Sequence, residues 1–157
     1  MLRIRKIQPE DAEACFNTQH ANHYHERGLY SETAWKFISS FLIDSWVATV
    51  DEGGYRVVGH CVGLIQNLDG PMIPEEYHNQ IAYNPLDNCV HPDFRMEGIS
   101  GLLTDKICES YPMIKTQIHA DNIGAEHILL TRDFKIVREI PNFYKDGGGT
   151  KILIRKG

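Results

Sequence analysis

The stretch from Asn88 to Glu109 constrains the fold more than any other part of this chain. It reads N-C-V-H-P-D-F-R-M-E-G-I-S-G-L-L-T-D-K-I-C-E. Cys89 and Val90 suit the end of a strand, and Pro92 stops that strand because proline has no N–H for a neighbouring strand. Apolar residues then return at helical spacing from Leu102 onward. The stretch therefore predicts a strand, a tight loop and a helix in succession.

This order of elements is suited to holding a phosphate group. The first amides of a helix have no partner inside the helix, and the helix dipole adds partial positive charge there. Glycine lets an anion approach the backbone closely. Gly98, Ser100 and Gly101 crowd the expected helix start, and Arg95 adds a guanidinium. A plain strand-to-helix turn without a ligand is the alternative, since short glycine motifs are weak evidence by themselves.

The pattern V-x-P-x-x-R-x-x-G-x-S, followed by L-L on a helix, resembles the acetyl-coenzyme A loop of the GCN5-related N-acetyltransferases. That family carries Gln/Arg-x-x-Gly-x-Gly/Ala at this point. Arg95, Gly98 and Ser100 occupy the three marked positions, and Ser100 departs from the pattern while remaining small. Residues 122–134 carry a second likeness, because N-x-x-A-x-x-I-L followed by Phe134 resembles the family's N-x-x-A-x-x-L-Y…G-F segment.

The resemblance implies acetyl-CoA as the cofactor, held largely through backbone groups. The backbone of Cys89 and Val90 would align the pantetheine arm, and the amides of residues 96–101 would hold the pyrophosphate. Asn122 would reach the pantetheine or phosphate region, although it also reads as a helix cap. The full expected set of cofactor contacts is Cys89, Val90, Arg95, Met96, Glu97, Gly98, Ile99, Ser100, Gly101 and Asn122.

The activity that the resemblance implies is transfer of an acetyl group to a primary amine of a small molecule or peptide by direct attack. The attacking amine must lose a proton to a base, and the thioester oxygen needs a donor, for which the Val90 amide would serve. Asp87 lies beside the expected thioester position, and His60 has a suitable intrinsic pKa. Asp51 and Glu52 lie in a turn and are poorer candidates for the base.

One departure bears on the catalytic acid. The family often uses a tyrosine in the N-x-x-A helix, where this chain has Leu129, and the glycine before Phe134 is replaced by Asp133. Tyr144 is an alternative acid, or the thiolate leaves unassisted, since a thiol pKa of roughly 8.5 makes it a fair leaving group. The replacement also leaves open a second function, a non-catalytic acyl-CoA-binding sensor or partner subunit on the same fold.

The acceptor side is expected between the first two helices, because that segment lines the acceptor pocket in the resembled family. Tyr24, His25 and Tyr30 are therefore candidate substrate-binding residues. His23 and His25 are two residues apart and do not share a helix face. Since no CxxC or HExxH accompanies them, we expect no metal site.

The rest of the chain predicts a mixed α/β (α+β) fold. We expect a single N-acetyltransferase-like domain over residues 1–157, with a central twisted mixed sheet of about seven strands flanked by about four helices. Gly59 and Gly63 mark a bulge or a close backbone approach in the returning strand of a hairpin. The expected strands are 2–7, 45–50, 55–68, 86–91, 114–120, 134–137 and 150–156, and the expected helices are 8–28, 31–42, 102–110 and 122–132, with an irregular excursion over 72–85.

Composition narrows the function classes. The chain has 157 residues, enough for one domain with a sizeable core, and its net charge of −5 argues against non-specific nucleic-acid binding. The four cysteines form no CxxC pair, so we expect free thiols in a reducing compartment. No apolar run reaches the ~18 residues of a membrane span, and the N-terminus does not resemble a signal peptide. We expect a cytoplasmic protein without membrane or nucleic-acid partners, and the resemblance is compatible with a homodimer.

A different nucleotide-binding α/β protein is a weaker alternative. The loop lacks the Lys-Ser/Thr ending of a P-loop, and it does not have the early position that a dinucleotide-binding fold requires.

Overall fold

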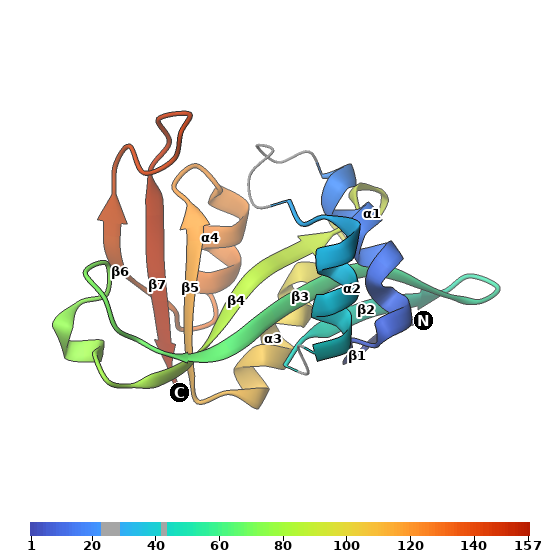
Figure 1. Cartoon of the computed structure of the whole chain (residues 1–157), viewed down its shortest axis with the longest axis horizontal. Coiled ribbons are helices and arrows are strands. Elements are labelled where there is room, and N and C mark those ends of the chain that lie inside the picture. The colour runs from blue at the N-terminus through green and yellow to red at the C-terminus, as the bar shows by residue number, and fades with distance from the viewer. Residues whose placement is uncertain (23–28, 42–43) are drawn as a thin grey trace. The chain divides into compact units, whose positions relative to one another are not determined.

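The structure is a computed structural model that describes residues 1–22, 29–41 and 44–157. Within these residues it contains seven strands and four α-helices, which confirms the predicted mixed α/β fold (Figure 1). The strands are β1 (Leu2–Lys6), β2 (Trp46–Asp51), β3 (Tyr55–Asn67), β4 (Ile81–Val90), β5 (Met113–His119), β6 (Lys135–Ile140) and β7 (Thr150–Lys156). The helices are α1 (Ala12–Ala21), α2 (Glu32–Phe41), α3 (Ile99–Ser110) and α4 (Ile123–Leu130).

The strands are hydrogen-bonded in the order β1-β2-β3-β4-β5-β7-β6. The pairs β1/β2, β2/β3, β5/β7 and β6/β7 are antiparallel, and β4/β5 is parallel through the single pair Tyr83 and Ile114. The sheet is therefore mixed, as predicted. No helix in the described ranges has the length and apolar character needed to cross a membrane.

The chain forms two compact units, residues 1–64 with 86–106 and residues 65–85 with 107–157. Because both units contain two separate stretches of sequence, the prediction of one continuous domain over residues 1–157 stays a prediction. The two units are described separately below.

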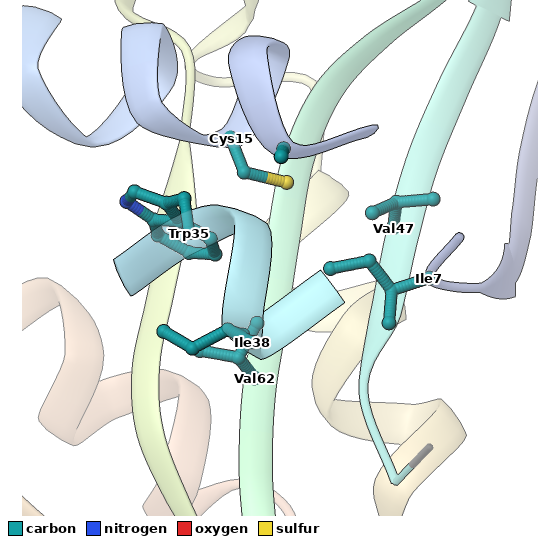
Figure 2. Packing of buried hydrophobic residues seen from close by; sticks show 7 residues of the cluster. Ile7, Cys15, Trp35, Ile38, Val47 and Val62 are labelled. Atoms are coloured by element: carbon teal, nitrogen blue, oxygen red, sulfur yellow. The ribbon is translucent and has the colours of Figure 1, made fainter. Parts of the chain in front are cut away.

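In the first unit, α1 and α2 bury apolar side chains against β2 and β3. Figure 2 shows Trp35 and Ile38 of α2 gathered with Cys15 of α1 near the strand residues Val47 and Val62. These side chains are at most 7% exposed. Ser31 begins α2 as predicted, since its hydroxyl accepts from the amide of Ala34 at 3.1 Å.

The start of α1 follows the predicted proline-led pattern. Pro9 opens a short 3-10 turn (Pro9–Asp11), and the Asp11 carboxylate accepts from the Gln8 amide at 2.7 Å and from Arg5 at 2.8 Å. The helix then runs to Ala21, whereas the sequence predicted a continuation toward Gly28. Residues 23–28 lie outside the described part of the chain.

The predicted bulge in the β2–β3 hairpin is present. The register shifts between Ala48 and Thr49, which pair with Gly59 and Val57 respectively. A side chain at Gly59 would begin 3.1 Å from the Cys89 carbonyl oxygen. Glycine is favoured there because the β3 and β4 backbones approach each other closely, so that a Cβ atom would make a tight contact.

In the second unit, a separate apolar core lies on one face of β5, β7 and β6. Its buried residues are Leu68, Ile73, Ala82, Met113, Ile152 and Ile154. β5 and β7 pair along their whole lengths, from Met113 opposite Lys156 to His119 opposite Thr150. This core is built from strands that are distant in sequence and from the segment that joins β3 to β4.

One strand boundary was predicted wrongly. The sequence indicated an irregular excursion as far as Pro85, but β4 already begins at Ile81 and includes Pro85. A proline is compatible with a strand where no neighbour needs its missing N–H. The irregular segment is therefore shorter than predicted and contains one 3-10 turn, Glu75–Tyr77.

Candidate active site

The loop between β4 and α3 has the geometry that the glycine pattern predicted. Gly98 has a φ of 75° and Met96 a φ of 67°, so two of four consecutive residues are left-handed. The Gly98 carbonyl accepts the amide of Leu102 at 3.1 Å, which places Gly98 at the entrance of α3. The amides of Ile99, Ser100 and Gly101 then occupy the first turn, where a helix offers no carbonyl partners. Arg95 and Glu97 are exposed on the same loop.

The end of β4 is held by an asparagine that the sequence analysis did not single out. Asn22, directly after α1, donates from Nδ2 to the Cys89 sulfur at 2.8 Å and to the Val90 carbonyl at 3.0 Å. Its Oδ1 atom accepts from the guanidinium of Arg95. On the β3 side, the His91 amide donates to the Val58 carbonyl at 2.7 Å. Asn22 therefore connects the end of α1, the end of β4 and the loop before α3.

The structure brings two predicted catalytic residues into direct contact. His60 Nε2 lies 2.6 Å from Asp87 Oδ2. The His60 side chain is fully buried, whereas the Asp87 side chain is 24% exposed. The Trp35 ring packs edge-on against the imidazole, with ring centroids 4.7 Å apart. Of the two residues, only the carboxylate can meet a molecule that arrives from solvent.

The hydrogen bond also assigns the tautomer of His60. Because Nε2 faces a carboxylate, Nε2 carries the proton and donates it. Nδ1 is buried and has no hydrogen-bond partner in the part of the chain that the structure describes. The hydrogen bond therefore orients the Asp87 carboxylate.

Tyr30 is the one predicted acceptor-side residue that the structure describes, since Tyr24 and His25 fall within residues 23–28. The Tyr30 ring packs edge-on against Trp35 at 5.5 Å. The Gln19 side-chain oxygen accepts both the Tyr30 amide at 2.8 Å and Trp35 Nε1 at 3.1 Å, which sets the position of both residues. Burial, and then the negative charge of Asp87, raises the pKa of Tyr30. The Tyr30 hydroxyl therefore lies close enough to Asp87 for the carboxylate charge to affect its pKa.

Cys89 is a poor nucleophile in this setting. Burial, and then the charge of Asp87, raises the pKa of the Cys89 thiol to about 12. The thiolate is the reactive form of cysteine, so at neutral pH this thiol is largely inert.

The same residues form the one cluster of possible metal ligands found within the described ranges. One donor atom each from His60, Asp87 and Cys89 lies within 4.8 Å of the other two. Two ligands of a tetrahedral zinc ion stand about 3.4 Å apart, given metal–ligand distances near 2.1 Å. The 2.6 Å between His60 and Asp87 is shorter, so the observed geometry is that of a hydrogen bond.

Two further predicted site residues belong to the second unit. Tyr144 stacks on His119 with ring centroids 5.0 Å apart, and its hydroxyl lies 3.4 Å from Thr150 Oγ1. Asn122 caps α4 as predicted, because its Oδ1 accepts the Ala125 amide at 3.1 Å. The catalytic role of Tyr144 and the cofactor contact of Asn122 stay predictions.

Two of the departures from the family pattern, Leu129 and Asp133, also lie in this unit. Leu129 is buried, and it has no group that could donate a proton. Asp133 has a φ of 66°, so it adopts the left-handed backbone that a glycine would take at that point.

The sequence matches no protein-family model and no curated protein sequence. Solved structures do match. The chain is similar to Arabidopsis thaliana NAA60 in complex with acetyl-CoA, with a TM-score of 0.81, 16% identity and 100% of each chain covered. It is also similar to the NatC complex bound to Gag peptide and CoA, with a TM-score of 0.77, 14% identity and coverage of 99% of this chain and 98% of that one. A third match is the acetyltransferase of GNAT family from Streptococcus pneumoniae, with a TM-score of 0.76, 11% identity and 99% of each chain covered. The chain therefore has the fold of the GCN5-related N-acetyltransferases.

Proposed function

We propose that this protein is an acetyl-CoA-dependent N-acetyltransferase that moves the acetyl group to a primary amine by direct attack. The observation that carries the proposal is the contact between His60 and Asp87, two sequence-predicted candidates for the base that lie next to the predicted cofactor strand. It occurs on a fold whose solved examples include one in complex with acetyl-CoA.

The first turn of α3 supports the cofactor assignment. Apart from its chain neighbours, no atom of the described residues lies within 4 Å of the position that a Cβ would take on Gly98, so the approach to this backbone is open. Unpaired amides at a helix start, together with the dipole, favour an anion such as a pyrophosphate. The exposed Arg95 adds a positive charge at the same loop. We assign the pyrophosphate to the amides of residues 96–101 and the pantetheine arm to the backbone of Cys89 and Val90.

Acetyl-CoA, when bound, supplies an activated acetyl thioester. Asp87 takes a proton from the acceptor nitrogen, directly or through one water, so that the amine attacks in its neutral form. The His60 Nε2–H group donates a hydrogen bond to the Asp87 carboxylate and holds the carboxylate in position. The Val90 amide would donate to the acetyl oxygen as negative charge develops there, and CoA would leave as the thiolate when the C–S bond breaks. Because the Cys89 thiol stays protonated, we assign it no covalent role.

The acceptor that we favour is the α-amine of a peptide. One solved relative in fold is bound to a peptide and CoA. The half-buried Tyr30 ring near Asp87 offers a wall for a first side chain, and the net charge of −5 is compatible with a cationic acceptor. Small-molecule amines are the second acceptor class.

The test combines binding and turnover. Calorimetry with CoA and with acetyl-CoA measures cofactor binding. Release of free CoA thiol is then followed with three acceptors, a peptide with a free N-terminus, the same peptide with a blocked N-terminus, and a polyamine. We expect turnover with the free peptide and none with the blocked one.

A variant locates the cofactor site. Gly98→Glu should abolish CoA binding, because the new carboxylate opposes the pyrophosphate. Gly53→Glu is the matched control. Gly53 also has space for a side chain and a left-handed φ of 81°, but it lies in the β2–β3 turn, away from the predicted cofactor loop. If Gly98→Glu binds CoA with unchanged affinity, the cofactor does not bind at this loop. Binding without turnover on any acceptor would favour the non-catalytic acyl-CoA sensor.

A further inference from the structure

Lys115 of β5 is a buried lysine in the apolar core of the second unit. It pairs with Ile154 across the β5–β7 ladder, and its residue is only 8% exposed. Side chains two residues apart on a strand share a face, so Lys115 lies on the same face as Met113. That face carries the core cluster of this unit, which includes Met113 and Ile154.

The Lys115 side chain has no hydrogen bond and no ion pair within residues 1–22, 29–41 and 44–157, and burial is the one cause of its pKa shift. Two other long cations of the same unit do have partners. Lys151 lies 3.0 Å from both carboxylate oxygens of Glu126, and Arg138 donates to the Pro71 carbonyl at 2.7 Å. Burial alone lowers the pKa of Lys115. A lysine almost never occupies such a position unless something pairs with it.

Lys115 lines a cavity of about 260 Å³, together with residues at the end of β3 and in the connection from β3 to β4. Its lining residues besides Lys115 are Gln66, Asn67, Leu68, Asp69, Gly70, Pro71, Met72 and Ile73. The covering segment is itself held by hydrogen bonds. The Leu68 amide donates to the Gln80 carbonyl at 2.8 Å, and His78 Nε2 lies 2.8 Å from the Ile73 carbonyl oxygen. Hydrogen bonds to backbone groups therefore hold the segment that lines the cavity in place.

The lining indicates which ligand suits the site. Leu68, Pro71, Met72 and Ile73 form an apolar wall that favours a short aliphatic or aromatic body. Asp69 is the one carboxylate in the lining, and its Oδ1 accepts the Asn79 amide at 3.2 Å. Its charge opposes a dianion such as phosphate more strongly than a monoanion.

From this geometry we propose that the cavity binds a small monocarboxylate, with the ligand carboxylate on Lys115 Nζ and the apolar body against Leu68, Met72 and Ile73. A carboxylate supplies both the missing counter-charge and charge-assisted hydrogen bonds. Burying an unpaired cation is costly, whereas a paired and hydrogen-bonded one is tolerated.

The test uses benzoate as the probe and inorganic phosphate as the comparison, without CoA. Titration of the ¹⁵N-labelled protein should shift the amide resonances of residues 66–73 with benzoate and leave them unmoved with phosphate at equal concentration. Lys115→Met keeps the length of the side chain and removes the amine. Since it also removes a buried cation, we expect it to fold, and we expect benzoate affinity to fall at least about tenfold.

Two further variants separate this site from others. Asp69→Asn keeps the oxygen that accepts the Asn79 amide and should bind benzoate about two- to fivefold more tightly. Gly98→Glu, which should lose CoA, should bind benzoate as the wild type does, so the two proposals fail independently. Equal benzoate affinity in folded Lys115→Met, or no shift of residues 66–73 at millimolar benzoate in the wild type, would overturn the inference.

Discussion

Asp87→Asn isolates the proton-accepting role of the carboxylate from its structural role. The amide has the same shape and keeps an oxygen that can accept from His60 Nε2, which lies 2.6 Å from the carboxylate in the wild type. The partner imidazole therefore stays paired in its buried position. What the variant loses is a group that can take a proton from the acceptor amine at neutral pH.

The expected loss follows from that single change. A positioned general base contributes about 10²- to 10⁴-fold to a rate. At about 1.4 kcal/mol per factor of ten, this corresponds to about 3–5 kcal/mol of transition-state stabilisation. We therefore expect kcat/KM of Asp87→Asn at pH 7 to fall by two to four orders of magnitude, with CoA affinity unchanged because the predicted cofactor contacts lie elsewhere.

The pH dependence sharpens the prediction. A peptide α-amine has a pKa of about 8, so above that pH it is already neutral in solution and no longer needs the base. The deficit of Asp87→Asn should shrink as pH rises from 6.5 to 9. A merely structural role for Asp87 predicts a deficit that does not depend on the protonation of the acceptor.

The assay measures initial rates of CoA thiol release with the free-N-terminus peptide across that pH range. Asp51→Asn is the matched control, because it makes the same change in charge at an exposed position at the end of β2, and it should stay within about twofold of the wild type. If Asp87→Asn also stays within about threefold at pH 7, Asp87 is not the base and the mechanism proposed above is wrong.

Three further predictions concern stability, measured by chemical denaturation. Lys115→Met should stabilise the fold by about 1–3 kcal/mol at pH 7. Burial lowers the pKa of Lys115, and Asp69 is the charged group that lines the cavity beside it. The folded state therefore binds fewer protons than the unfolded state between the lowered pKa and the ordinary lysine pKa of 10.5. The free energy of unfolding of the wild type then rises with pH through that window, so the difference in stability between Lys115→Met and the wild type should shrink toward pH 10. A difference that grows with pH would contradict the lowered pKa of Lys115. Gly59→Ala should destabilise by about 1–3 kcal/mol, because the new Cβ would lie 3.1 Å from the Cys89 carbonyl oxygen and 3.3 Å from Ile99 Cγ2. Gly124→Ala, the same chemical change in helix α4 with only the Asn122 side chain at 4.0 Å, should instead stabilise by about 0.5–1 kcal/mol. Equal effects of the two glycine variants would show that the close approach at β3 has no energetic consequence.

Local sequence signals predicted most of the elements because their causes are local. Helical spacing, the proline-led start of α1, the Ser31 cap and the Asn122 cap all depend on residues within a few positions of one another. The start of β4 was missed for the same reason. Pro85 reads as a strand breaker, but whether a strand tolerates a proline depends on the neighbouring strand.

The candidate site was only partly predictable. The loop around Gly98 carries a local pattern, and Asp87 is close in sequence to the predicted cofactor strand. His60 lies 27 residues from Asp87, and Asn22 lies 67 residues from Cys89, so their contacts depend on tertiary packing. An asparagine after a helix is commonplace, and nothing in its neighbours indicates that it binds β4. The buried position of Lys115 was missed as well, because a single lysine in a strand normally faces solvent.

The packing of Trp35 on His60 gives this protein a built-in optical reporter. The chain has two tryptophans, and the second, Trp46, lies on β2 beside Lys6 and Lys106. In a Trp46→Phe variant, all indole emission would come from Trp35, whose ring centroid is 4.7 Å from that of the imidazole. The emission of Trp35 should therefore report a change in the surroundings of His60 in solution, without label or substrate.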